Sequence, residues 1–404
     1  MNLLPFLKEL AKETIRDCTF TKEVTLKSGL TRINLLLPSG DEKYKSFWVR
    51  DAAMMAESLL VDSANLKQYI ELIATCGQNG REILYLDNGL KVPPYAVADH
   101  INYNGRPVFF PGTMNDGTDQ GIGKYGFYPP FCDNFYFVIM VGAYVRQTGN
   151  RQLLHQVYKE IPLINRLEYA VQSYNIHPET QLCFSEEDYF TVDWGFVDAV
   201  KKSGFLAFAS LLRYRAYMVL SELNPEQKMI YTKQATQIQS SLMNLLYDRE
   251  AGLFYSATGI GHQHDVWATA YALCIGALKD ERAAKSLTAL YEKGVVTTLG
   301  SYVRHVIKTE DGSDTCTWES TFLRYNSYQN GGYWATPIGW YARALYNYNP
   351  TIGEAFLQAF IDHTDAHRGE GAPYEWLHPE TGVTDGHRYG TSGVLPYVAF
   401  MDLI

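Results

Sequence analysis

Apolar and polar residues recur along most of the chain with the periodicity of α-helices. Thirteen segments with this pattern predict helices, at residues 4–17, 48–62, 65–78, 132–148, 151–174, 203–222, 225–247, 264–278, 280–293, 318–326, 334–347, 352–365 and 391–403. Residues 23–37 (EVTLKSGLTRINLLL) instead indicate strand, with Gly29 at a hairpin turn. The pattern therefore predicts an all-α protein with a small N-terminal β-hairpin.

The predicted helices are of two kinds. RDAAMMAESLL, DVWATAYALCIGAL and WATPIGWYARAL are apolar nearly all round, so we expect them to be buried. LKQYIELIATC and DERAAKSLTALYEK have one apolar and one polar face, as helices at a surface do. An approximate alternation of the two kinds predicts about twelve helices in six hairpins, with the buried helices inside, which is an (α/α)6 toroid. No interdomain linker is visible, so residues 1–404 are expected to form a single catalytic domain.

Four connections between the predicted helices are long, at residues 79–131, 175–202, 294–317 and 366–390. Long loops in a compact domain are usually functional. These loops hold most of the Gly, Asn, Asp, His and aromatic residues outside the predicted helices. We therefore expect them to cover one end of the toroid and to form a pocket there.

The composition limits the classes of function. A hydrophobic fraction of 46% excludes a disordered or fibrous chain. The 30 Tyr, 19 Phe and 7 Trp fit either a sugar-binding cleft, where rings stack on the apolar faces of sugars, or a large aromatic core. The formal charge is −9 and no segment concentrates Lys and Arg, so a nucleic-acid partner is not expected.

The sequence also indicates where the protein is located and whether it binds a metal. No apolar run is as long as the roughly 20 residues of a membrane span, so no membrane partner is expected. The first residues, MNLLPFLKELAKETI, lack the pattern of a signal peptide. The six cysteines are scattered, without CxxC or Cys/His spacing, and predict neither a metal site nor a need for any cofactor. Free thiols favour the cytoplasm, or the periplasm if a signal peptide has been removed.

Charged residues flanked by aromatic residues are the candidates for chemistry. In FWVRD, Trp48, Arg50 and Asp51 open a helix predicted to be buried. Arg50 and Asp51 either bind sugar hydroxyls by charge-assisted hydrogen bonds or cap and pair at the helix N-terminus. In the loop FSEEDYFTVDWG, Asp193 lies between Val192 and Trp194 and is the likelier buried acid, whereas Glu186 and Glu187 fit a solvated loop. A carboxyl against aromatic rings has a raised pKa and can donate a proton.

Two later segments complete the candidate site. Trp318 and Glu319 precede YQNGGYW, in which Gln329 and Asn330 fit either substrate binding or an ordinary turn before Trp334. In GAPYEWLHPETG, Glu375 lies on a loop between Tyr374 and Trp376. Two carboxylates from distant loops that meet in one pocket are what glycoside hydrolysis needs, one as the proton donor and the other to activate water or attack the sugar.

These segments, in this order, resemble the six-hairpin (α/α)6 glycosidases, which include trehalases, processing α-glucosidases, glucoamylases and the glucosidase domain of glycogen debranching enzymes. FWVRDAAMMAESLL is similar to that superfamily's aromatic-x-Arg-Asp signature, TVDWGF to its general-acid segment, YQNGGYWATPIGW to a segment that lines the pocket, and PYEWLHPETG to its general-base segment. The resemblance runs from about residue 44 to the C-terminus.

The resemblance implies roles for individual residues. Arg50 and Asp51 would hold the terminal sugar, Asp193 would be the general acid and Glu375 the general base of an inverting, exo-acting hydrolase of an α-linked carbohydrate. Trp48, Trp194, Trp318, Glu319, Gln329, Asn330, Trp334 and Trp376 would bind substrate. The segment after Asp193 lacks the Ser-x-Arg-Trp run of trehalases, so Glu187 and Glu319 remain alternatives for the acid.

Other functions fit the same toroid. A sugar epimerase would use paired histidines, for which His305 with His378 or His387 are candidates. A polysaccharide lyase would need Tyr and His beside basic residues. A non-catalytic sugar-binding protein would keep the aromatic pocket and Arg50 with Asp51, but would place no two carboxylates across it. The sugar, the linkage and the oligomeric state are not determined by the sequence.

Overall fold

A computed structural model describes residues 3–26, 29–41, 43–111, 126–260, 262–310, 317–382 and 387–403. These residues form thirteen α-helices. Their bounds are α1 Leu4–Asp17, α2 Val49–Ala56, α3 Ser63–Leu72, α4 Cys132–Thr148, α5 Leu163–Val171, α6 Ala207–Leu223, α7 Lys228–Leu245, α8 Val266–Cys274, α9 Asp280–Glu292, α10 Gly294–Thr297, α11 Ile338–Tyr348, α12 Pro350–Ala366 and α13 Gly390–Val398.

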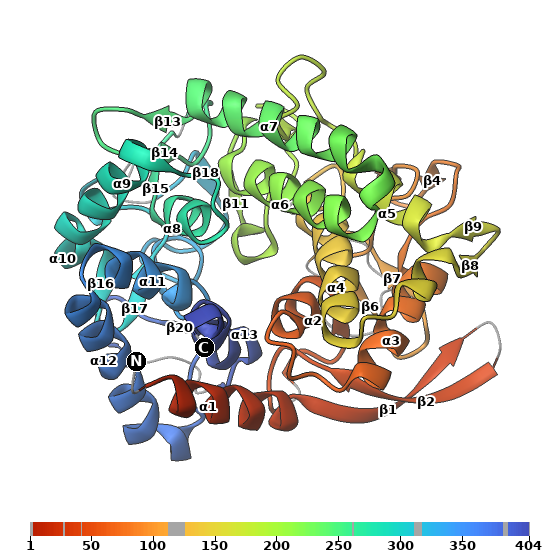
Figure 1. The fold of residues 1–404 in the computed structure, drawn as a ribbon, viewed down its shortest axis with the longest axis horizontal. Coiled ribbons are helices and arrows are strands. Elements are labelled where there is room, and N and C mark those ends of the chain that lie inside the picture. The colour runs from red at the N-terminus through yellow and green to blue at the C-terminus, as the bar shows by residue number, and fades with distance from the viewer. Residues whose placement is uncertain are drawn as a thin grey trace.

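Six of these helices contact one another in a closed succession. Along the chain, α2 packs on α4, α4 on α6, α6 on α8, α8 on α11 and α11 on α13, and α13 packs back on α2. The other long helices lie outside this ring: α3 packs on α4, α5 on α4 and α6, α7 on α6, α9 on α8 and α11, α12 on α11, and α1 on α13. Figure 1 shows this arrangement, with the two ends of the chain close together.

The burial of each helix follows its sequence pattern. In α2 every residue from Val49 to Ala56 is buried, including Arg50 and Asp51. In α9 only Ser286, Ala289 and Leu290 are buried, because Asp, Glu, Arg and Lys occupy the opposite face. The inner helices are therefore enclosed by protein and the outer ones have a solvated side, as the alternation in the sequence predicts.

The strands are short, apart from one hairpin. In it β1 (Thr19–Leu26) pairs antiparallel with β2 (Gly29–Leu36), where the sequence predicts strand. The remaining pairs and small sheets are β3 (Phe47–Trp48) with β6 (His100–Ile101) and β7 (Pro107–Val108); β4 (Leu84–Tyr85) with β5 (Lys91–Val92); β8 (Val157–Tyr158) with β9 (Ile161–Pro162); β10 (Phe184–Ser185) with β12 (Gly204–Phe205); β11 (Val200–Lys201) with β18 (Ser320–Thr321); β13 (Tyr247–Asp248), β14 (Leu253–Tyr255) and β15 (His264–Asp265); and β16 (Thr298–Leu299), β17 (Tyr302–Arg304), β19 (Tyr333–Trp334) and β20 (Trp376–Leu377). The all-α prediction is thus too narrow, because the loops between helices contain these strands.

Two helix predictions are wrong. The predicted helix at 318–326 is instead β18 followed by turns, since its backbone pairs with β11 rather than with itself. The predicted helix at 151–174 is a 3₁₀ turn (Arg151–His155), the hairpin β8–β9 and then α5. In the first case pairing with a remote segment overrides helical periodicity, which is a local signal, and in the second a short local hairpin interrupts the predicted helix.

Most of the core is one large cluster of buried apolar residues to which the helices from α1 to α13 contribute, and a second, smaller cluster comprises Leu90, Val92, Ala96, Ala98, Phe109 and Phe110. An aromatic stack lies within the ring of inner helices: Trp194 stacks on Phe208 at 4.1 Å between ring centroids and meets Trp267 edge-on at 5.7 Å. Phe196 packs edge-on against Trp334 at 5.7 Å. Many of the chain's aromatic residues are therefore core residues, and Phe196 connects this core to the pocket described below. Within the described part of the chain, no helix is long and apolar enough to cross a membrane.

Candidate active site

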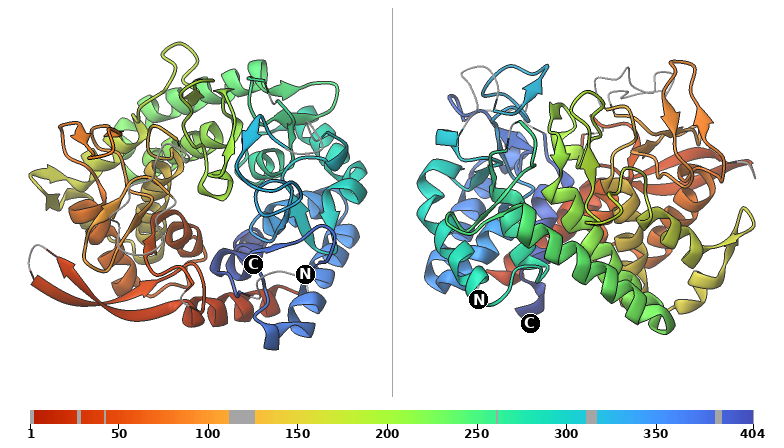
Figure 2. Two further views of the ribbon diagram at one scale, coloured as in Figure 1. Left: turned by 180° about the vertical axis from the view of Figure 1, so that it is seen from behind. Right: turned by 90° about the horizontal axis from the view of Figure 1, so that it is seen from above.

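A pocket with a volume of about 210 Å³ lies where several long loops meet the inner helices. Trp48 and Tyr389, which immediately precede α2 and α13, line it together with residues of the predicted functional loops. Its full lining is Pro38, Tyr44, Trp48, Arg50, Asp99, His100, Pro111, Gly195, Phe196, Asp198, Ala199, Phe322, Leu323, Tyr328, Glu375 and Tyr389. In Figure 2, right, most loops and short strands gather at one end of the molecule, as the lengths of the connections predict.

Glu375 is the carboxyl on one side of this pocket. It is 5% exposed and precedes β20. The Tyr44 hydroxyl lies 3.0 Å from both carboxyl oxygens, and the Tyr328 hydroxyl donates to Oε1 at 3.1 Å. Burial raises the pKa of Glu375 to about 7, while the two phenols and the positive charge of Lys43 act in the opposite direction. Donors that favour the ionised form suit a carboxylate that accepts a proton.

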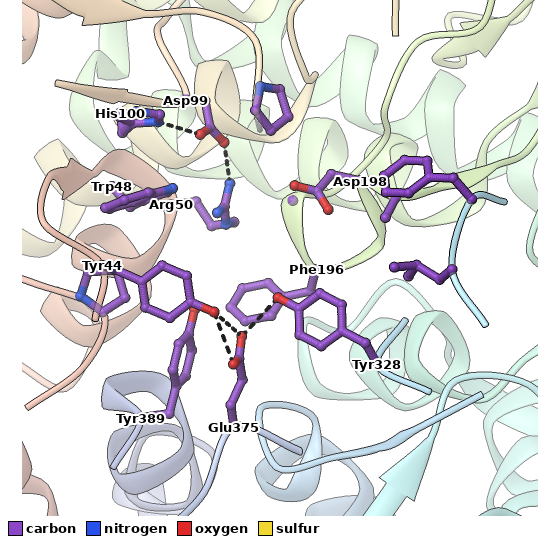
Figure 3. A pocket seen from close by; sticks show the side chains of 16 residues that line it. Tyr44, Trp48, Arg50, Asp99, His100, Phe196, Asp198, Tyr328, Glu375 and Tyr389 are labelled. Atoms are coloured by element: carbon purple, nitrogen blue, oxygen red, sulfur yellow. Dashed lines mark hydrogen bonds and ion pairs between the residues drawn. The ribbon is translucent and has the colours of Figure 1, made fainter. Parts of the chain in front are cut away.

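Asp198 is the carboxyl on the other side. It follows a 3₁₀ turn at Gly195–Val197, and Figure 3 shows it facing Glu375 across the pocket. The Gln329 amide donates to Asp198 Oδ1 at 2.8 Å. The side-chain amide oxygen of Gln329, Oε1, accepts from the Ala199 backbone N–H at 2.7 Å, so one side chain holds both the turn and the carboxyl. Burial raises the pKa of Asp198 to about 7, despite the positive charge of Arg50. A carboxyl protonated near neutral pH can act as a proton donor.

Arg50 forms the charged floor of the pocket. Its guanidinium donates to Asp99 Oδ1 at 2.7 Å, and its Nε lies 3.3 Å from Asp51 Oδ2. The close approach of Gly195 makes this placement possible, since a Cβ on Gly195 would lie 1.9 Å from Arg50 Nη1. Although burial opposes the charge, Asp99 and Asp51 raise the pKa of Arg50 well above its ordinary value. Arg50 is therefore a fixed cation.

The neighbours of Arg50 are themselves held in place. Asp99 Oδ2 bonds His100 Nδ1 at 2.8 Å, and the His100 ring stacks on Trp48 at 4.5 Å. Asp51 Oδ1 accepts from the Tyr389 hydroxyl at 2.8 Å. Hydrogen bonds therefore link pocket residues across α2, Asp99 with His100 of β6, and the start of α13, which fixes the geometry of this side of the pocket. Figure 3 shows the bonds from Asp99 to Arg50 and His100.

Asp193 lies outside this pocket. Its Oδ2 is 2.5 Å from the Lys202 ammonium, and both side chains are almost wholly buried. The Lys202 ammonium also lies over the Trp318 ring, 5.3 Å from its centroid. Asp193 and Lys202 thus form an internal ion pair. The carboxyl that the same loop directs into the pocket is Asp198, five positions later in the printed sequence.

The other residues predicted to bind substrate fall into two groups. Trp48 and Arg50 line the pocket. The remaining ones are not lining residues. Several of them contact the lining: Asp51 bonds Tyr389, Gln329 bonds Asp198, Asn330 bonds Leu323, the Trp334 indole donates to the backbone carbonyl oxygen of Tyr328, and Trp376 packs beside Tyr328. The Trp318 indole donates to the backbone carbonyl oxygen of Gln329, Glu319 bonds Ser203 and Lys201, and Trp194 stacks in the core. Glu187 is exposed and is not among the lining residues.

Sequence reasoning missed several residues of the pocket, namely Asp99, His100, Phe196, Asp198, Phe322, Leu323, Tyr328 and Tyr389. Three of them lie in segments that the sequence had singled out: Asp198 shares the aromatic and acidic loop of Asp193, Phe196 ends TVDWGF, and Tyr328 begins YQNGGYW. The remaining residues, Asp99, His100, Phe322, Leu323 and Tyr389, lie outside those motifs and meet them only in the folded chain.

No protein-family model and no curated protein sequence matches the chain. Solved structures of glycoside hydrolases share its fold. A GH63 mannosylglycerate hydrolase from Thermus thermophilus, in complex with glucose, is 15% identical with a TM-score of 0.57, over 97% of this chain and 99% of that one. A structure described as a wild-type glycosidase is 14% identical with a TM-score of 0.59, over 100% and 98% of the two chains.

A rhamnosidase from Klebsiella oxytoca with rhamnose bound has the same fold within a longer chain. It is 12% identical with a TM-score of 0.56, and the match covers 99% of this chain but 64% of the rhamnosidase. The described chain therefore has a fold found in glycoside hydrolases of more than one kind.

Proposed function

We propose that this protein is a glycoside hydrolase that cleaves a terminal sugar bound in the pocket, with Asp198 as general acid and Glu375 as general base. The observation that carries the proposal is the pair of carboxyls facing each other across an aromatic-lined pocket, with Arg50 beneath them. The fold shared with glycoside hydrolases, some of them solved with glucose or rhamnose, supports a carbohydrate substrate.

The proposed reaction uses one proton donor and one proton acceptor. Asp198 gives its proton to the glycosidic oxygen, so the bond from that oxygen to the anomeric carbon breaks as the leaving group departs as an alcohol. Glu375 takes a proton from a water molecule that attacks the anomeric carbon from the opposite face. The sugar product therefore has inverted configuration. A water between substrate and base requires carboxyls roughly 6.5–9.5 Å apart.

The assignment of the two roles rests on their hydrogen bonds. Two phenols donate to Glu375, which favours the carboxylate that a base must be. Asp198 accepts one side-chain hydrogen bond, from the Gln329 amide, against two for Glu375, so its ionised form receives less stabilisation, although burial raises the pKa of both carboxyls to about 7. Asp198 thus replaces Asp193 as the proposed acid, because Asp193 is engaged with the buried Lys202 ammonium.

The same proposal includes the architecture of the protein, its mode of cleavage and its location. The closed succession of α2, α4, α6, α8, α11 and α13, with outer helices packed on it, supports an (α/α)6 toroid that forms a single catalytic domain over residues 1–404. The proposed enzyme is exo-acting, which means that it removes a terminal α-linked sugar, and its proposed location is the cytoplasm. An epimerase would need paired histidines, and among the described lining residues the only histidine is His100. His305 bonds Asp265 and His387 pairs with Asp41 instead.

The test is hydrolysis of a panel of aryl glycosides, glycosyl fluorides and disaccharides by the wild type and by Asp198→Asn, Glu375→Gln and Asp193→Asn. The first two variants should lose about 10²- to 10⁴-fold in kcat, the range associated with general acid–base catalysis. Proton NMR of the first-formed sugar should show the inverted anomer. Hydrolysis that survives in both Asp198→Asn and Glu375→Gln, or the absence of any hydrolysed substrate, would overturn the proposal.

A further inference from the structure

The lining of the pocket differs between its two sides. Beneath the carboxyls lie the buried charged and polar groups of Arg50, Asp99 and His100. Beside Asp198 the lining is Ala199, Phe322 and Leu323, which carry no charge. Phe322 lines the pocket and is 47% exposed, so its ring is accessible to a molecule bound there.

The backbone explains why Phe322 lies next to Asp198. Strand β18 ends at Thr321, which pairs with Val200 of β11, two residues after Asp198. The Thr321 hydroxyl donates to the Ala199 carbonyl oxygen at 2.6 Å. The Asn330 amide donates to the Leu323 carbonyl oxygen at 3.2 Å, which holds the segment after Phe322. Hydrogen bonds on both sides therefore fix the position of Phe322 relative to the proposed acid.

The position of Phe322 beside the proposed general acid indicates which part of the substrate Phe322 contacts. The acid must reach the glycosidic oxygen, so the side chains around it contact the group that leaves rather than the sugar that is attacked. We infer that Phe322, with Leu323, forms the binding surface for the leaving group, and that the substrate is a glycoside whose leaving group presents an apolar ring face. Such a face is offered by the C–H side of a second sugar or by an aryl or benzyl group. This inference rests on the proposed function.

The experiment compares leaving groups on one sugar, chosen as the sugar that the wild type hydrolyses. The substrates are the benzyl glycoside, the methyl glycoside and the glycosyl fluoride, whose small leaving group needs little protonation. Phe322→Ala should lower kcat/KM for the benzyl glycoside by about tenfold or more, through loss of apolar contact. It should change kcat/KM for the glycosyl fluoride by less than about twofold, because fluoride does not extend to the ring surface.

Two further variants serve as controls for Phe322→Ala. Phe322→Trp should restore hydrolysis of the benzyl glycoside, since it keeps an aromatic face. Tyr85→Ala removes another exposed aromatic residue, 66% exposed and not part of the pocket lining, and should leave all three substrates unchanged. Thermal unfolding by circular dichroism checks that each variant is folded, as expected for exposed positions.

The outcomes separate this inference from the proposed function. Equal losses in Phe322→Ala for the benzyl glycoside and the fluoride, or no loss for the benzyl glycoside, would overturn the role of Phe322 while the hydrolase proposal stands. If the wild type hydrolyses no glycoside or glycosyl fluoride of any sugar tested, the proposed function fails before the inference is reached.

Discussion

Tyr328 and Gln329 are adjacent in the chain, but their side chains bond the two carboxyls on opposite sides of the pocket. The Tyr328 hydroxyl donates to Glu375 at 3.1 Å, and the Gln329 amide donates to Asp198 at 2.8 Å. Tyr328 has the left-handed backbone angle φ 45°, uncommon for a residue with a side chain. The indoles of Trp334 and Trp318 donate to the backbone carbonyl oxygens of Tyr328 and Gln329. One short segment thus positions both proposed catalytic groups.

Removal of a phenol beside Glu375 should move the acid limb of the pH–rate profile. The hydrogen bonds from Tyr44 and Tyr328 lower the pKa of Glu375, against the effect of burial. Tyr328→Phe and Tyr44→Phe should therefore raise that pKa, so activity that requires ionised Glu375 should fall at a higher pH than in the wild type. The measurement is kcat/KM as a function of pH, with Tyr85→Phe as a control outside the pocket. An unchanged acid limb in both variants would contradict the role of Glu375 as base.

Loss of the Gln329 amide should affect protonation of the leaving group. Gln329 holds both Asp198 and the Ala199 backbone, so Gln329→Leu should displace the acid. We expect kcat for an alkyl glycoside to fall by about tenfold or more, since general acid catalysis contributes roughly 10²- to 10⁴-fold. The corresponding glycosyl fluoride should be much less affected. Equal losses on both substrates would show that Gln329 does not act through the acid.

Substitution of Asp193 should lower the free energy of unfolding and leave the catalytic reaction of the folded protein unchanged. Asp193→Asn removes the partner of the buried Lys202 ammonium, and breaking a buried ion pair destabilises a protein by about 3–5 kcal/mol. Urea unfolding should show this loss. Asp193→Leu with Lys202→Met, which removes both charges, should recover part of it. The folded fraction of Asp193→Asn should keep the pH–rate profile of the wild type, and a lost alkaline limb would restore Asp193 as the acid.

The two pocket carboxyls should make the protein less stable as the pH rises. Burial raises the pKa of both Glu375 and Asp198 to about 7 in the folded state, whereas carboxyls in the unfolded chain ionise near pH ~4. Their stabilising contribution is therefore complete below about pH 4 and is lost as the pH rises through about 7.

A variant in which one of these carboxyls is neutral tests this dependence of stability on pH. Glu375→Gln should gain stability relative to the wild type between pH 4 and pH 8, by about 2–4 kcal/mol. Comparison of the two proteins by urea unfolding at each pH cancels the effect of the substitution on packing. Lys43→Gln is a useful companion, because removing that positive charge should raise the pKa of Glu375 further. A pH-independent difference between Glu375→Gln and wild type would contradict the raised pKa.

The sequence predicted the parts of this protein that local patterns control. Apolar periodicity located α1 and α4 to the residue, and strand propensity located the β1–β2 hairpin. Charged residues flanked by aromatic ones identified Arg50 and Glu375, since such residues are rarely placed in apolar surroundings without a partner or a role. Both of them line the pocket.

Only the tertiary structure decided which acid faces Glu375. Asp193 and Asp198 lie five positions apart in one loop with similar neighbours, so composition could not separate them. The choice depends on Lys202, which pairs with Asp193, and on Gln329, which is 131 positions from Asp198 and bonds its carboxyl. The helix predicted at 318–326 is instead the short strand β18 followed by turns for the same reason, because its partner β11 is remote in sequence. Periodicity reports the local preference of a segment, whereas the direction of a side chain in a loop is set by contacts between segments that meet only after folding.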